Sequence, residues 1–221
     1  MHKSYVIRKG RFTDAQKKAY ESLSEKYLIP YKEEELDFES VYNDNLKNKN
    51  VTLEIGFGSG LATAEIAQAN PDKNYLGIEV HKPGIGRLLW EIEKRGLINI
   101  RIIEHDAVFV LDKMIPRGSL EAIHIFFPDP WPKKRHHKRR LVKRPFTQTL
   151  AQKLKKDGYI YMVTDWEEYA LYALEELENT AEIKNYYNGF AESIDWRPKT
   201  RFENKGLLKK HVIRELYFKK I

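Results

Sequence analysis

The chain has 221 residues, which is enough for one α/β domain with a short extension and for a buried core without disulfides. It contains no cysteine, which excludes disulfides, thiolate metal sites and thiol catalysis, and favours a reducing, cytoplasmic compartment. The 39 Lys and Arg against 32 Asp and Glu give a formal charge of +7, which favours a polyanionic partner. No stretch reaches the roughly 18 apolar residues of a membrane helix, so the pattern predicts no membrane span.

The first 45 or so residues are polar and charged, and they differ in pattern from the rest of the chain. One helix is predicted there, from Thr13 to about Leu28, with Thr13 or Asp14 as its N-cap. We therefore expect an N-terminal arm with one helix over residues 1–45, followed by a catalytic domain over residues 46–221. Whether the arm orders on a ligand is left open.

From Val51 onward, short apolar runs alternate with amphipathic stretches, which is typical of βαβ units around a mostly parallel sheet. The predicted strands are Val51–Ile55, Asn74–Val80, Asn99–Glu104, Leu120–Phe126 and Gly158–Thr164. The predicted helices are Gly60–Ala69, Pro83–Lys94, Ala107–Met114, Lys143–Lys155 and Trp166–Glu178. The alternating run His211–Lys219 predicts a last strand, and the weakly apolar segment Ala181–Ala191 indicates a further edge strand.

A glycine loop follows the first predicted strand. Gly56, Gly58 and Gly60 stand where a doubly wound sheet binds ligands, and glycine lets the backbone approach such a ligand closely. The spacing is G-x-G-x-G, whereas a dinucleotide fingerprint is G-x-G-x-x-G, whose helix N-terminus receives a pyrophosphate. Glu54, just before the loop, would repel a pyrophosphate but attract the cationic end of S-adenosylmethionine. The loop therefore predicts a methyl donor as cofactor.

Two more carboxylates follow the next strands. Glu79 comes 25 residues after Glu54, where an acidic side chain accepts hydrogen bonds from ribose hydroxyls. Asp106 follows the third predicted strand and is expected to meet the adenine amine or the backbone beside it. The alternative for Asp106 is the N-cap of the following helix.

The fourth predicted strand ends in a proline-rich loop, Pro128–Pro132. Three prolines in five residues cannot continue a ladder, so the loop is expected to be rigid and to hold Asp129 and Trp131 at the rim of the crevice. Asp129 suits a guanine N1–H or amine, and Trp131 suits base stacking. The alternative for Trp131 is a buried side chain in a turn that caps the sheet.

A basic run follows this loop at once, with six Lys or Arg in eight residues. It consists of Lys133, Lys134, Arg135, His136, His137, Lys138, Arg139 and Arg140. Such a run is commonly a solvated face. Beside a reaction centre that a phosphate backbone must pass, RNA contact is the favoured interpretation, with affinity that falls with salt. The two histidines have no evident third ligand, so no metal site is predicted.

Two later segments add polar groups near the same edge. Asp165 follows the fifth predicted strand and is either a second base-reading carboxylate or the N-cap of the next helix. Before the last strand, Thr200, Arg201, Phe202 and Glu203 place a hydroxyl, a cation, an aromatic ring and an acid together.

Together these motifs resemble the bacterial tRNA (guanine-N7)-methyltransferases. The resemblance covers nearly the whole chain, and the segments that carry it are Glu54–Gly60, Gly77–Glu79, Pro128–His136, Thr164–Asp165 and Thr200–Glu203. It implies a Rossmann-like, seven-stranded methyltransferase fold with a mostly parallel sheet and an antiparallel last strand. It also implies that S-adenosylmethionine methylates N7 of a variable-loop guanine in tRNA.

The resemblance assigns roles to individual residues. It implies that Glu54, Glu79, Asp106 and Asp129 contact the methyl donor and that Asp129 is also catalytic. The residues implied in substrate contact are Lys133, Asp165, Thr200, Arg201, Phe202 and Glu203. Those implied in RNA binding are Arg135, His136, His137, Lys138, Arg139 and Arg140. Relatives commonly carry tyrosine in place of Phe202.

Three other functions compete with this one. An NAD-dependent dehydrogenase would need the dinucleotide spacing and a catalytic Tyr/Lys or His pair. A non-enzymatic RNA-binding protein with the same fold would not need carboxylates in the crevice. A methyltransferase for proteins or small molecules would not need the basic run. The sequence favours tRNA as partner, without membrane or metal, and a monomer, with a homodimer left open.

Overall fold

A computed structural model describes residues 4–5, 10, 12–42, 50–192, 194, 196–198, 203 and 212–221. Its helices are α1 (Asp14–Tyr27), α2 (Phe38–Val41), α3 (Leu61–Ala69), α4 (Lys82–Arg95), α5 (Ala107–Lys113), the 3₁₀ helix η2 (Lys134–Arg139), α6 (Phe146–Lys153) and α7 (Glu167–Glu178). Its strands are β1 (Val51–Ile55), β2 (Asn74–Glu79), β3 (Ile100–Glu104), β4 (Leu120–Phe126), β5 (Leu154–Thr164), β6 (Ile183–Asn185) and β7 (Arg214–Lys220).

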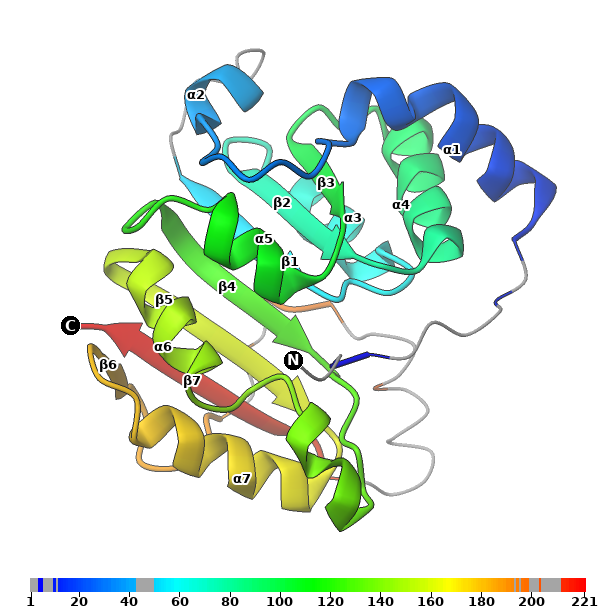
Figure 1. The fold of residues 1–221 in the computed structure, drawn as a ribbon. Helices are drawn as coiled ribbons and strands as arrows, with labels where there is room; N and C mark the ends of the chain where they lie inside the picture. The colour runs from blue at the N-terminus through cyan, green and yellow to red at the C-terminus, as the bar shows by residue number, and fades with distance from the viewer. Residues whose placement is uncertain are drawn as a thin grey trace.

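The strands form one seven-stranded sheet in the order β3-β2-β1-β4-β5-β7-β6 (Figure 1). Strands β1 to β5 pair in parallel, whereas β7 is antiparallel to both β5 and β6. This confirms the predicted α/β fold with an antiparallel last strand. Because the strand order reverses between β1 and β4, a ligand crevice is expected at the carboxyl ends of these two strands.

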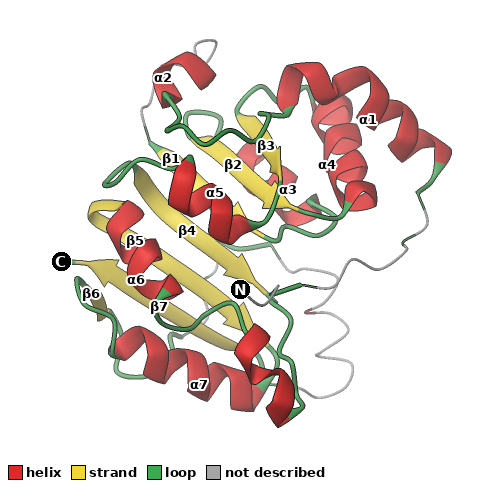
Figure 2. Ribbon diagram, viewed as in Figure 1, coloured by secondary structure: helices red, strands yellow, loops and turns green. Residues whose placement is uncertain are grey.

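Helices cover both faces of the sheet (Figure 2). On one face, α1, α3 and α4 contribute Ala19, Ala64 and Leu88 to a buried cluster. On the other, α5 and α6 contribute Val110 and Leu150 to a second cluster, together with residues of α7. All five residues of β1 are buried, as expected for a central parallel strand covered on both sides. Within the described part of the chain, no helix is long and apolar enough to cross a membrane.

Most element boundaries lie within one residue of the predicted ones, and the larger differences are at α6, β5 and the last strand. Helix α6 begins at Phe146 instead of Lys143 and ends at Lys153, because β5 already begins at Leu154. Leu154 pairs with Leu120, and the register then shifts before Ala122 pairs with Tyr159. Because Leu154 pairs with β4 on the far side of this irregularity, Leu154 and Lys155 belong to β5, although the sequence pattern predicted a helix there. The last strand begins at Arg214, three residues after its predicted start.

The predicted edge strand within Ala181–Ala191 is confirmed in a short form. Only Ile183–Asn185 forms the strand β6, and Ala191 adds an isolated bridge to Glu215. Both lie against β7, which therefore sits between β5 and β6 instead of at the edge of the sheet.

The described part of the N-terminal segment packs onto the domain. Helix α1 lies along α4, and Leu28 bridges Ile102 in parallel beside the edge strand β3 (Figure 1). The segment also contains a second helix, the short α2, which the sequence did not predict. After α2, the Tyr42 hydroxyl donates to the buried carbonyl of Tyr75 over 2.7 Å. The segment thus contributes to the core on both sides of α2.

A capping box begins α1. The Thr13 hydroxyl accepts from the Gln16 N–H over 3.3 Å, and the Gln16 amide oxygen accepts from the Thr13 N–H over 2.9 Å. We expect Thr13→Ala to lower the free energy of unfolding by about 1 kcal/mol, because the Gln16 N–H loses the hydroxyl that accepts from it. Urea denaturation measures the change. Thr13→Ser, which keeps the hydroxyl, is the control, and an equal loss in both variants would contradict the role of the cap.

Candidate active site at the carboxyl edge of the sheet

The glycine loop between β1 and α3 forms a cradle. Gly56, Gly58 and Gly60 have φ angles of +71°, +60° and +67°, which glycine adopts without steric cost. A Cβ on Gly56 or Gly58 would meet no atom within 4 Å, so the loop faces open space there. A Cβ on Gly60 would lie 2.6 Å from the Cβ of Leu88. The first two glycines therefore line the cradle, and the third lets α3 and α4 pack closely.

Glu54, in β1, is a buried carboxyl beneath this loop and is only 5% exposed. Burial, and then the negative charge of Glu79, raise the pKa of Glu54 to about 7. No Lys or Arg among the described residues forms an ion pair with it. A buried carboxylate without a cation is costly, so this position suits a cationic ligand group.

Glu79 orients the glycine loop. Its carboxylate accepts from the N–H groups of Gly58 over 2.8 Å, Val80 over 2.7 Å and His81 over 3.1 Å. Three backbone donors thus hold the side chain at the end of β2, at the edge of the cradle. The sequence predicted its place but not that it also supports the loop.

Asp106 is the N-cap of α5, which was the alternative interpretation for this residue. Its Oδ1 accepts from the Val108 N–H over 2.9 Å. The cap engages one carboxylate oxygen at the carboxyl end of β3. The second oxygen is not part of this cap, so capping and the predicted adenine contact are compatible.

The cradle fits S-adenosylmethionine by the chemistry of its groups. Glu54 would hold the ammonium group and Glu79 the ribose, while Gly56 and Gly58 leave the space that the ligand needs. A dinucleotide would instead place its pyrophosphate beside a buried carboxylate.

The raised pKa of Glu54 predicts pH-dependent cofactor binding. The cationic ligand favours the ionised carboxylate, so binding must release a proton below pH 7 and none above it. We expect the Kd for S-adenosylmethionine to rise about tenfold per pH unit from pH 7 down to pH 5.5. Calorimetric titration at several pH values measures this. Glu54→Gln should bind weakly with little pH dependence, and a flat profile for the unaltered protein would contradict the assignment.

The proline-rich loop projects from β4 next to the cradle. It is attached to the sheet where the Phe127 N–H donates to the Val163 carbonyl over 2.8 Å. Asp129 is exposed and forms no hydrogen bond or ion pair with any described residue. The loop thus leaves the Asp129 carboxylate open to solvent at the rim of the cradle.

Trp131 is partly buried within the protein. Its indole N–H donates to the carbonyl oxygen of Ser4 over 3.1 Å. The Arg139 guanidinium lies 5.0 Å from the ring centroid, and the His136 ring meets Trp131 edge-on at 5.8 Å. These contacts favour the structural interpretation of this tryptophan over free base stacking.

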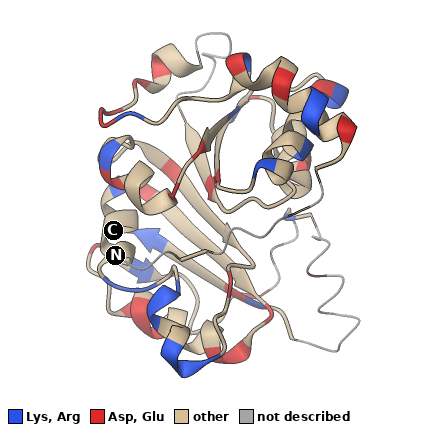
Figure 3. Ribbon diagram, turned by 45° about the vertical axis from the view of Figure 1, so that its right-hand side comes forward, with Lys and Arg blue, Asp and Glu red and all other residues tan. Residues whose placement is uncertain are grey.

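The basic run forms the 3₁₀ helix η2 and its flanks. Figure 3 shows Lys and Arg gathered on this segment. Lys133, Arg135 and Lys138 are exposed, as RNA contact requires. Desolvation, and then the charges of neighbouring cations, first among them Arg135, lower the pKa of His136.

Arg140 departs from the prediction that it binds RNA. It is 1% exposed, whereas Lys133, Lys134, Arg135 and Lys138 are exposed. Its Nε donates to the Pro130 carbonyl over 3.0 Å, and its Nη2 pairs with Glu168 over 3.1 Å. The side chain is enclosed by the protein, so it has no surface for a phosphate.

Asp165 lies at the same edge, between β5 and α7. The N-cap of α7 is Trp166, so the alternative that Asp165 caps this helix is wrong. The Thr164 hydroxyl accepts from the Trp166 N–H over 3.2 Å and shapes the turn. The substrate role of Asp165 stays a prediction.

Glu203 is held by an arginine that the sequence analysis missed. It is 6% exposed, and its Oε2 accepts from Nη1 of Arg197 over 2.6 Å. Arg197 also pairs with Glu215 of β7 over 3.4 Å and donates to the Tyr161 hydroxyl over 3.1 Å. Thr200, Arg201 and Phe202 lie outside the described residues. A lone Arg between Trp196 and Pro198 carries no sequence signal for such a network.

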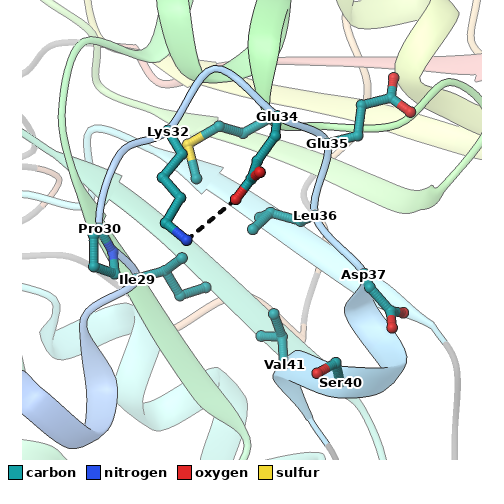
Figure 4. A pocket seen from close by; sticks show the side chains of 10 residues that line it. Ile29, Pro30, Lys32, Glu34, Glu35, Leu36, Asp37, Ser40 and Val41 are labelled. Atoms are coloured by element: carbon teal, nitrogen blue, oxygen red, sulfur yellow. Dashed lines mark ion pairs between the residues drawn. The ribbon is translucent and has the colours of Figure 1, made fainter.

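A separate cavity of about 300 Å³ lies at the opposite end of α5 from Asp106, beside Met114 (Figure 4). Ile29 and Leu36 line its apolar part, and an ion pair between Lys32 and Glu34 spans 3.2 Å at its mouth. The cavity is not part of the candidate site. The described residues contain no group of three side chains suited to bind a metal.

Comparisons with known proteins agree with this geometry. A family model described as "Putative methyltransferase" matches residues 48–216. The tRNA (guanine-N(7)-)-methyltransferase of Nitrosomonas eutropha is 48% identical over 99% of this chain and 96% of its own. That of Chromobacterium violaceum is 47% identical over 99% and 95%.

Solved structures share the fold at low identity. The 16S rRNA methyltransferase KamB has a TM-score of 0.61 at 12% identity, over 84% of this chain and 95% of its own. A SAM-dependent methyltransferase from Aquifex aeolicus has a TM-score of 0.53 at 15% identity, over 93% and 98%. By its family model and its full-length relatives, the chain belongs to the tRNA (guanine-N7)-methyltransferase family.

Proposed function

We propose that this chain transfers the methyl group of S-adenosylmethionine to N7 of guanine 46 in the variable loop of tRNA. The full-length similarity to tRNA (guanine-N(7)-)-methyltransferases supports the reaction. The structural observation that carries the proposal is that the residues of the candidate site lie at one edge of the sheet. The cradle of Gly56 and Gly58, the exposed Asp129 and the basic helix η2 all meet at the carboxyl ends of β1 and β4.

Position and charge are what the protein contributes to this reaction. When bound, S-adenosylmethionine supplies an electrophilic methyl group on a sulfonium centre. The transfer is an in-line displacement, so the main task of the chain is to align the base with that methyl group. Glu54 and Glu79 hold the donor end, and the Pro128–Pro132 loop limits where the base can sit.

Asp129 has a role that does not require proton removal. Guanine N7 carries a lone pair and no proton, and the methylated base gains positive charge. An exposed carboxylate at the rim stabilises that charge as it develops and orients the base through its N–H groups.

The remaining residues surround the substrate in this proposal. Lys133, Asp165 and the segment Thr200–Glu203 contact the nucleotide. The exposed cations of η2 bind the phosphate backbone, which makes affinity depend on salt. Since one chain carries the cradle, Asp129 and η2, we propose a monomer that acts on cytoplasmic tRNA.

The test combines methylation with mapping of the product. Purified protein is incubated with labelled S-adenosylmethionine and unmodified tRNA, and borohydride with aniline then cleaves the chain at N7-methylguanosine. Cleavage at guanine 46 supports the proposal. A tRNA with guanine 46 replaced by adenine is the matched control and should stay uncleaved.

Two other outcomes would overturn parts of the proposal. Labelled tRNA that is cut elsewhere, or not cut, would retain methyl transfer but reject the proposed atom or position. Unlabelled tRNA, together with salt-sensitive tRNA binding, would favour a binding protein instead of an enzyme.

A further inference from the structure

Arg140 joins three parts of the candidate site. Its Nε binds the carbonyl of Pro130, the residue between Asp129 and Trp131. Its backbone N–H donates to the His137 carbonyl over 2.9 Å at the end of η2. Its Nη2 pairs with Glu168 in the first turn of α7. One side chain thus links the proline-rich loop, the basic helix and α7.

The burial of this guanidinium is compensated by its surroundings. Its central carbon lies 5.1 Å from the ring centroid of Tyr169 and 4.9 Å from that of Tyr172, both in α7. Glu168 is 55% exposed, and although desolvation opposes it, the hydrogen bond and charge of Arg140 lower its pKa. A buried cation is retained only where such partners exist, so this arrangement is specific.

The loop that Arg140 contacts needs external support. Phe127, just before the loop, and Trp131, within it, have φ angles of +50° and +48°, a region that bulky residues rarely adopt. Strained residues persist where surrounding contacts over-determine the backbone. The prolines of the loop have no N–H to donate, so their backbone can be hydrogen-bonded only at the carbonyl groups. Arg140 donates to one of these, the Pro130 carbonyl.

We propose that Arg140 is a positioning residue that holds the Pro130 carbonyl and thereby sets the place of Asp129 in the reaction centre. It acts through Asp129 and does not touch the tRNA. Because the same residue ends η2, phosphate binding on η2 and the position of Asp129 are mechanically linked. This inference rests on the proposed role of Asp129 in methyl transfer.

Kinetics distinguish positioning from RNA contact. Arg140→Met removes the charge and all donors, and we expect kcat to fall by about 100-fold with the KM for tRNA within about threefold, because misplaced reacting groups lose orientation. Arg140→Lys keeps the charge but cannot span both Pro130 and Glu168, so it should recover only part of the rate. A raised KM with unchanged kcat would overturn the proposal in favour of RNA contact.

A double variant tests whether Arg140 acts through Asp129. In an Asp129→Asn background, Arg140→Met should lower kcat by no more than about twofold, since residues that act as a unit are non-additive. An equal fall in both backgrounds would overturn the proposal. The matched control is Arg144→Met, because Arg144 also pairs with α7, through Glu176 over 3.2 Å, and lies outside the site.

A measurement without substrate separates this inference from the proposed function. The four tryptophans give four indole signals in an NMR spectrum of the protein labelled with ¹⁵N-tryptophan, and Trp131→Phe assigns one of them. The Trp131 signal should shift in Arg140→Met and Arg140→Lys but not in Arg144→Met. An unmoved signal overturns the positioning role. If the unaltered protein does not methylate tRNA but the Trp131 signal shifts in these variants, the proposed function is rejected. The inference that Arg140 holds the loop in place is then retained.

Discussion

Asp129→Asn should lower kcat for tRNA methylation by about 10² to 10³-fold while leaving tRNA affinity close to normal. The substitution keeps the size of the side chain but removes the negative charge that faces the developing cation of the methylated guanine. Affinity should persist because the exposed cations of η2, such as Arg135, are unchanged. Single-turnover rates at saturating tRNA and S-adenosylmethionine measure the effect.

The fold should not respond to this substitution. Asp129 is exposed and unbonded among the described residues, so Asp129→Asn should leave the melting temperature unchanged. Asp112→Asn, an exposed carboxylate on α5 away from the site, is the control and should keep full activity. Equal turnover of Asp129→Asn and the unaltered protein would reject the catalytic role of Asp129.

Gly84→Ala should disrupt the cofactor cradle by pushing against the backbone of Gly58. Gly84 lies in the first turn of α4, and a Cβ there would lie 2.0 Å from the carbonyl oxygen of Gly58. Backbone must move, so we expect a loss of about 1 to 3 kcal/mol in unfolding free energy from overpacking. If half of that strain shifts the Gly58 loop, the Kd for S-adenosylmethionine rises about two- to tenfold, since 1.4 kcal/mol is a factor of ten.

Gly96→Ala provides a matched control on the same helix. Gly96 ends α4 with a φ of +64° and has open space around the position of a Cβ. Its substitution should cost about 1 to 2 kcal/mol of left-handed strain. Cofactor affinity should stay normal, because the change lies at the far end of α4. Unchanged cofactor affinity in Gly84→Ala would show that the close contact between Gly84 and Gly58 does not shape the cradle.

The local parts of the site were predictable because their signals lie in a few neighbouring residues. Strands β1 and β4 have the predicted boundaries, since each is an apolar run that ends in glycines or prolines. Glu54 and Glu79 stand at the expected strand ends. The resemblance supplied the family, which the full-length relatives confirm.

The basic run contains a residue whose burial the sequence did not predict. Arg139 and Arg140 are adjacent and chemically identical, yet only Arg140 is buried. Its environment comes from Glu168, Tyr169 and Tyr172 on α7, almost 30 residues further along the chain. Nothing in a run of cations indicates which one finds such partners.

The same distinction holds for the chain as a whole. The sequence by itself determined the α/β pattern, the glycine loop, the strand-end carboxylates and the family, because hydrophobic period and turn residues act over short distances. Only the tertiary structure decided that β7 lies between β5 and β6, that Arg197 holds Glu203, and that Arg140 braces the loop of Asp129. These depend on burial and on partners distant in the chain, and a buried charge takes its role from what surrounds it.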